Sequence, residues 1–140
     1  MDEQVKIWQR VKGDTAPPTD GLPGLAANAL AHAALYGTLA RQVQGPSRTI
    51  LLKLQEEEQH CARCLKGIFR MATGNRMQPA AVPLSSENME ATLRKCYGQC
   101  LKTLAAFEKR AYDPEFGPVF AHLATKKREH CCALTELLGF

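Results

Sequence analysis

The spacing of the apolar residues constrains this sequence most, because they recur at steps of three and four in four separate segments. This is the repeat of an amphipathic α-helix with one buried face. No segment alternates apolar and polar residues with a period of two, so strands are not expected. The sequence therefore predicts an all-α protein. The clearest stripe lies in the last segment and reads Phe116, Phe120, Leu123, Lys127, His130, Leu134 and Leu137.

Glycine and proline divide the chain into two similar halves. Gly45-Pro46-Ser47 predicts a short turn between helices over 25–44 and 46–73, and Gly74 ends the second of these. A third helix starts after Ser86, and Asp113-Pro114-Glu115 closes it and opens a fourth, which ends at Gly139. Two short-turn hairpins joined by a crossover linker over 76–84 predict an antiparallel four-helix bundle. We assign residues 25–140 to this bundle and residues 1–24 to an N-terminal extension.

Composition and charge exclude several classes of protein. The net charge of +4 is small and its lysines and arginines are scattered, so nucleic-acid binding is not expected. No apolar run approaches the roughly 18 residues of a membrane span. The charged start of the chain does not resemble a signal peptide, which predicts a cytoplasmic protein. In that compartment the six cysteines are expected to be reduced thiols or metal ligands.

Polar residues interrupt the apolar stripes halfway along each predicted helix. Folding each hairpin about its turn brings these interruptions to a common level. Burying several titratable groups together costs a few kcal/mol each unless they pair or bind a ligand. The pattern therefore predicts a functional layer in the middle of the bundle. Its predicted members are His32, Glu57, His60, Cys100, Lys127 and His130.

Two motifs around this layer resemble the rubrerythrin-like branch of the ferritin-like superfamily. They are LLKLQEEEQHCARCL around His60 and FAHLATKKREHCCAL around His130, and ALAHAALYGTLA in the first helix is similar too. The resemblance covers roughly residues 25–138. It implies a ferritin-like bundle, a di-iron centre and an oxidoreductase that reduces oxygen or peroxide.

The resemblance also identifies where this chain departs from the family. Glu57, His60 and His130 match family ligands, whereas Ala29, Cys100 and Lys127 stand where the family has carboxylates. The sequence therefore predicts a degenerate di-iron site with little or no oxidase or peroxidase activity. The predicted metal ligands are Glu57, His60, His130, Cys100 and His32.

Two other interpretations are open at this stage. In the first, Lys127 replaces the metal and forms a buried pair with Glu57, in a non-catalytic bundle that has no cofactor and serves interaction. In the second, Cys-x-x-Cys at 61–64 and Cys-x-x-x-Cys at 96–100 join His60 and His130 in a site for zinc or copper(I), which favour soft ligands. The possible partners are a second copy of the chain in a homodimer and an unidentified electron-transfer protein.

Overall fold

Four α-helices make up the described part of the chain, which a computed structural model gives for residues 19–80, 83–84 and 87–139. The predicted all-α class is confirmed for these residues. Residues 1–18 of the predicted N-terminal extension lie outside them. The helices are α2 (Leu22–Ala40), α3 (Pro46–Thr73), α4 (Met89–Arg110) and α5 (Gly117–Leu137).

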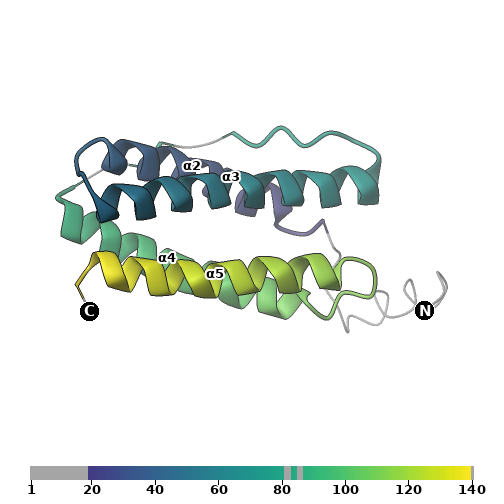
Figure 1. Ribbon diagram of the computed structural model, residues 1–140. Coiled ribbons are helices and arrows are strands. Elements are labelled where there is room, and N and C mark those ends of the chain that lie inside the picture. The colour runs from purple at the N-terminus through teal and green to yellow at the C-terminus, as the bar shows by residue number, and fades with distance from the viewer. Residues whose placement is uncertain (1–18, 81–82, 85–86, 140) are drawn as a thin grey trace.

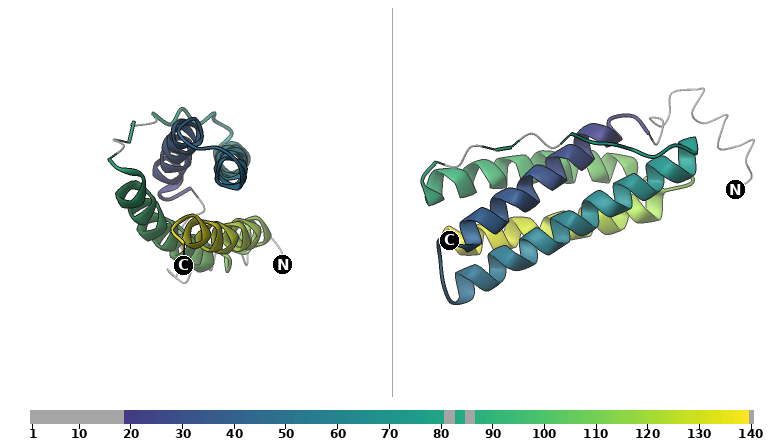
Figure 2. Two further views of the ribbon diagram at one scale, coloured as in Figure 1. Left: turned by 60° about the vertical axis from the view of Figure 1, so that its left-hand side comes forward. Right: turned by 90° about the horizontal axis from the view of Figure 1, so that it is seen from above.

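The helices are arranged as two hairpins. Helices α2 and α3 lie alongside one another, as do α4 and α5, and each pair is joined by a short turn (Figures 1 and 2). The hairpins contact each other through α3 and α5 and, less extensively, through α2 and α4. The described parts of the connection between α3 and α4 run back along the length of the bundle (Figure 1). This is the predicted pair of hairpins with a crossover.

Helix α2 differs most from its predicted bounds of 25–44. It begins three residues earlier because Pro23 is tolerated in a first turn and the preceding Leu22 is completely buried. It ends earlier because the backbone N–H groups of Arg41 and Gln42 donate to carbonyls only three residues back, at 3.2 and 3.0 Å. Such bonds tighten and close a last helical turn. Helix α2 therefore includes residues 22–24, which the sequence analysis placed before the first helix.

Asp113 organises the turn between α4 and α5, as the sequence predicts. Its Oδ2 accepts hydrogen bonds from the backbone N–H groups of Glu115 at 3.0 Å and Phe116 at 2.7 Å. The helix itself begins at Gly117, later than the predicted start at Pro114. The carboxylate therefore caps a turn that precedes α5.

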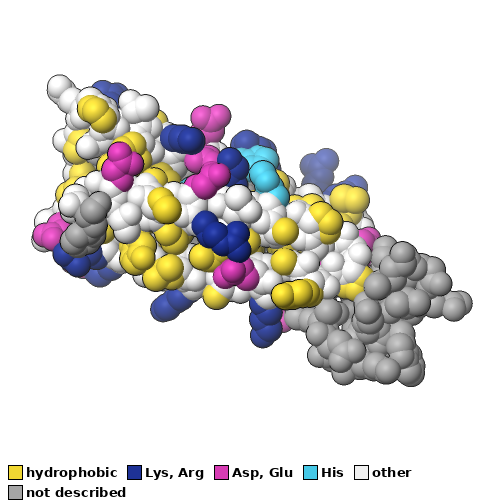
Figure 3. All heavy atoms as spheres, turned by 60° about the horizontal axis from the view of Figure 1, so that its bottom comes forward, with side chains coloured by type: hydrophobic (Ala, Val, Ile, Leu, Met, Phe, Trp, Pro, Cys, Tyr) yellow, Lys and Arg dark blue, Asp and Glu magenta, His cyan; other side chains and the backbone are white. Residues whose placement is uncertain are grey.

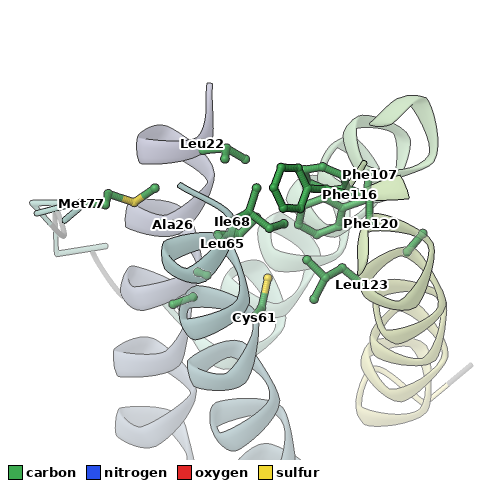
Figure 4. Close-up of a cluster of buried hydrophobic side chains, with 13 residues drawn as sticks. Leu22, Ala26, Cys61, Leu65, Ile68, Met77, Phe107, Phe116, Phe120 and Leu123 are labelled. Carbon is green, nitrogen blue, oxygen red and sulfur yellow. The ribbon is translucent and has the colours of Figure 1, made fainter. Parts of the chain in front are cut away.

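The core consists of two apolar clusters, one toward each end of the bundle. The first contains Phe107, Phe120 and Leu65, with residues of all four helices (Figure 4). The second contains Tyr36, Leu39 and Leu134 and also draws on all four helices. Buried polar side chains of α3 and α5 lie between these clusters, at 58, 127 and 130. A polar layer is therefore present, and it contains the predicted Lys127 and His130 together with Glu58, which was not among the predicted members.

On the face that Figure 3 shows, the surface of the described residues has no large patch of charges of one sign. Acidic and basic side chains are interspersed there with hydrophobic ones. Within the described residues, no helix combines the length and the apolar character needed to cross a lipid bilayer.

The tight turn before α5 yields a test of the fold. A Cβ at Gly117 would lie 2.5 Å from the backbone oxygen of Ala111, whereas one at Gly67 in α3 meets nothing within 4 Å. We expect Gly117→Ala to lower the free energy of unfolding by about 1–3 kcal/mol, as overpacking does. Gly67→Ala should raise it by up to about 1 kcal/mol, because alanine favours helix. Urea unfolding of both variants measures this, and a neutral Gly117→Ala would contradict the described turn.

Candidate functional site

A fully buried ion pair lies at the centre of the bundle. The Lys127 ammonium of α5 contacts Oε1 of Glu58 of α3, and the two residues are only 4% and 3% exposed. Because α3 and α5 belong to different hairpins, this pair joins the two halves of the molecule. The same carboxylate oxygen accepts a hydrogen bond from Nδ1 of His130, at 3.2 Å.

A second, more exposed pair lies beside the first. Nζ of Lys126 is 3.2 Å from Oε2 of Glu57 and 3.5 Å from Oε2 of Glu129. Nε2 of His130 is 3.6 Å from Oε1 of Glu57, so the imidazole lies between Glu57 and Glu58. The predicted pair of Lys127 with Glu57 is therefore wrong, because Lys127 contacts Glu58 and Glu57 contacts Lys126.

The rotation of α3 about its axis explains this correction. The apolar spacing of this segment predicts an inward stripe of Ile50, Leu54, Glu57, Cys61, Cys64 and Ile68. In the structure, Glu57 and Cys64 are only partly buried. The observed stripe shares Leu54, Cys61 and Ile68 with the predicted one, and its other three positions each lie one residue later in the chain. Its members are Leu51, Leu54, Glu58, Cys61, Leu65 and Ile68.

Burial and pairing have opposite effects on the pKa values of the buried pair of Glu58 and Lys127, which we call the inner pair. Burial raises the pKa of the Glu58 carboxyl, but the hydrogen bond from His130 and the Lys127 ammonium outweigh it and hold this pKa below 4.5. Burial lowers the pKa of Lys127, but the Glu58 carboxylate outweighs it and holds this pKa above 10.5. Both groups are therefore charged at neutral pH.

A narrow cavity of about 10 Å³ adjoins the inner pair. That volume is near the minimum for one water molecule. Glu58 and Lys127 line it together with polar groups of α2 and α4, namely Asn28, His32, Tyr36, Cys96, Gln99, Cys100 and Thr103. Oε2 of Glu58 and Nε2 of His130 are buried and have no hydrogen-bond partner. A donor in this cavity would satisfy the free carboxylate oxygen.

A wider cavity of about 300 Å³ lies between α2 and α4. It shares Asn28, His32, Cys96 and Gln99 with the narrow cavity, so the two adjoin along these side chains. The remaining lining mixes apolar and polar side chains, including Leu35 and Lys95. This is the side from which a small molecule could approach the inner pair.

The structure brings only some of the predicted site residues together. His130 contacts Glu57 and Glu58, and Cys100 and His32 line the narrow cavity. His60 does not join them. Its Nε2 lies 3.5 Å from Sγ of Cys64, and its ring meets that of His122 edge-on at 5.7 Å between centroids.

Glu58 is the residue that the sequence analysis missed. It is one of three consecutive glutamates, and the Glu-x-x-His spacing selects its neighbour Glu57. A stripe drawn through Leu51 and Leu65, both of which are buried, would have selected Glu58 instead.

All six cysteines are free thiols. Burial raises the pKa of Cys61 to about 12 and that of Cys96 to about 11. Burial also raises the pKa of Cys100, whose thiol accepts a hydrogen bond from Cys131. Such thiols hold little thiolate at neutral pH, and the thiolate is the form that binds metals. The predicted cluster of paired thiols with His60 and His130 is not assembled.

No group of three or more His, Cys, Asp or Glu side chains in the described residues is arranged to hold a metal ion. No protein-family model, curated protein or solved structure matches this chain.

The two neighbouring lysines of α5 provide a matched test of the layer. Lys127→Ala would leave Glu58 as an uncompensated buried charge, which costs about 3–5 kcal/mol. Lys126→Ala removes only the more exposed ion pair and should cost far less. The double variant Glu58→Gln/Lys127→Met removes both charges and should recover most of the loss. Thermal and urea unfolding measure this, and equal effects of the two lysines would contradict a buried inner pair.

The inner pair also predicts how stability depends on pH. Glu58 has a lowered pKa, so its contribution is complete above pH 4.5 and is lost as the pH falls through its folded value. Lys127 has a raised pKa, so its contribution is complete below pH 10.5 and is lost as the pH rises through its folded value. We compare the free energy of unfolding of the natural chain with that of Glu58→Gln/Lys127→Met. The difference should not depend on pH between pH 4.5 and pH 10.5. Below and above these limits, the natural chain should lose stability relative to the variant. A difference independent of pH would contradict the charged pair.

Proposed function

We propose that this protein is a rubrerythrin-like member of the ferritin-like superfamily in which a buried ion pair takes the place of the di-iron centre. It then has little or no oxidase or peroxidase activity. The observation that carries the proposal is the ammonium of Lys127, which occupies the middle of the bundle in contact with Glu58. A fixed positive charge at this point repels a metal cation.

The donor groups around the layer do not fit a di-iron centre. Two iron ions need several carboxylates, both as hard oxygen ligands and to balance their charge. By the family resemblance, Ala29, Cys100 and Lys127 hold three of those positions. Two glutamates contact His130. The charge of Glu58 is balanced by Lys127, and that of Glu57 by Lys126.

The proposed role of the layer is to fix how the two hairpins dock. Glu58 belongs to the α2–α3 hairpin, whereas Lys127 and His130 belong to the α4–α5 hairpin. A buried charge that meets no partner is costly, so sliding or rotating one hairpin against the other is penalised. In this proposal the bundle itself is the functional unit, as a non-catalytic protein that associates with a partner.

Metal loading tests the proposal. We expect far less than stoichiometric iron after anaerobic loading with ferrous ion, since the ligand positions are occupied by an ion pair and a thiol. Two tightly bound irons per chain, with an oxo-bridge absorption band, would contradict it. Zinc in the purified natural chain, removed by His60→Ala but not by Lys127→Ala, would instead support the soft-metal interpretation.

Charge reversal in the layer sharpens this test. Lys127→Glu should lower the melting temperature in the absence of metal, and added manganese, ferrous or zinc ions should restore part of it. Adding Cys100→Glu should strengthen this rescue, because another carboxylate then lines the same cavity. Lys126→Glu is the matched control and should show no comparable rescue by metal.

A further inference from the structure

We propose that Cys100 and Cys131 form a reversible disulfide that fastens α4 to α5. Sγ of Cys131 lies 3.3 Å from Sγ of Cys100. All six cysteines lie in the described part of the chain, and no other two have a thiol–thiol hydrogen bond there. A disulfide has a sulfur–sulfur distance of about 2.05 Å, so the two sulfurs need to approach by only about 1.2 Å.

The Cys100 side chain is held in position for this reaction by two contacts with one turn of α5. Its thiol donates to the backbone oxygen of Lys127 at 3.3 Å and accepts from Cys131. Lys127 precedes Cys131 by four residues, so its carbonyl also accepts the helical hydrogen bond of the Cys131 N–H. Oxidation therefore removes the thiol hydrogens without leaving that carbonyl unpaired.

Hydrogen peroxide is an oxidant small enough for a thiol between two helices. The partly exposed Cys131 sulfur attacks one peroxide oxygen, the O–O bond breaks, and the products are a sulfenic acid and water. The Cys100 sulfur then attacks the Cys131 sulfur, the S–O bond breaks, and the leaving hydroxide takes the Cys100 proton to form a second water. Two thiols lose two electrons in all, and one peroxide is reduced to two waters.

The order of the two steps follows from exposure. Cys100 is only 6% exposed, and burial raises its pKa, so it is the poorer first nucleophile. Once Cys131 is oxidised, the Cys100 sulfur already lies beside it, whereas a second peroxide must diffuse in from solvent. Internal attack is therefore expected to precede further oxidation of Cys131 to the sulfinic acid.

The disulfide would close the chain between α4 and α5, including the turn organised by Asp113. Cross-linking residues this far apart reduces the freedom of the unfolded chain. We expect oxidation to raise the melting temperature of the natural chain by roughly 5–10 °C. Dithiothreitol should reverse the increase.

The experiment must distinguish Cys100 from Cys96 and Cys131 from Cys132, because each two lie close together in the sequence. Trypsin releases residues 96–102, which contain Cys96 and Cys100, and residues 129–140, which contain Cys131 and Cys132. Native protein is therefore treated with hydrogen peroxide in a Cys96→Ser/Cys132→Ser background, where only one pair can link these peptides. Mass spectrometry without reduction should then find them joined, with loss of two hydrogens.

Two further variants make the result decisive. Adding Cys131→Ser or Cys100→Ser to this background should abolish the link and the dithiothreitol-sensitive rise in melting temperature. In the natural chain, the exposed Cys132 should stay available to iodoacetamide after oxidation. Absence of the link in this background, sulfinic acid at Cys131 with no link, or loss of iodoacetamide labelling at Cys132 in the oxidised natural chain would overturn the proposal.

Discussion

The arrangement of this molecule depends on one ion pair that is fully removed from water. Moving a carboxylate and an ammonium into a protein interior costs several kcal/mol per ion before they attract each other. Glu58 and Lys127 meet this cost by contacting one another, and His130 adds a hydrogen bond to the same oxygen. The pair contributes less to stability than to geometry, since apolar residues of similar size could fill the same space. What apolar residues would not supply is a penalty for misplacing α3 against α5.

The rest of the core is divided around this pair. Apolar side chains from all four helices fill the space on either side of it, and they pack in whichever way buries their surface. The polar layer is the part with directional requirements, because a charge or hydrogen-bond donor needs a particular partner. A slip of one helical turn would leave the apolar clusters still apolar but would separate Glu58 from Lys127. In the proposed role of the layer, this separation of Glu58 from Lys127 penalises the slipped register.

The sequence predicted the helices and their pairing well, because glycine, proline and capping residues act locally. Pro46 and Gly74 bound α3 as expected, and the stripe of α5 was predicted correctly through Lys127 and His130. The rotation of α3 about its own axis was not predicted correctly. Leu54, Cys61 and Ile68 are spaced by seven residues, which is close to two helical turns, and they fit both the predicted stripe and the observed one. Only the residues between these three positions distinguish the predicted stripe from the observed one. There, a run of three glutamates supplies a carboxylate to both stripes, Glu57 to the predicted one and Glu58 to the observed one.

The charges around the inner pair are balanced by direct contacts within the layer. Two carboxylates, Glu57 and Glu58, face two ammonium groups, Lys126 and Lys127. A divalent metal added to this set would bring two positive charges to a layer that is already neutral, and burial would make the excess costly. Removing Lys127 alone would leave an unpaired carboxylate, and adding a carboxylate alone would leave an unpaired acid. A metal ion could therefore be accommodated here only together with a change of charge in the layer, such as the replacement of Lys127 by a carboxylate.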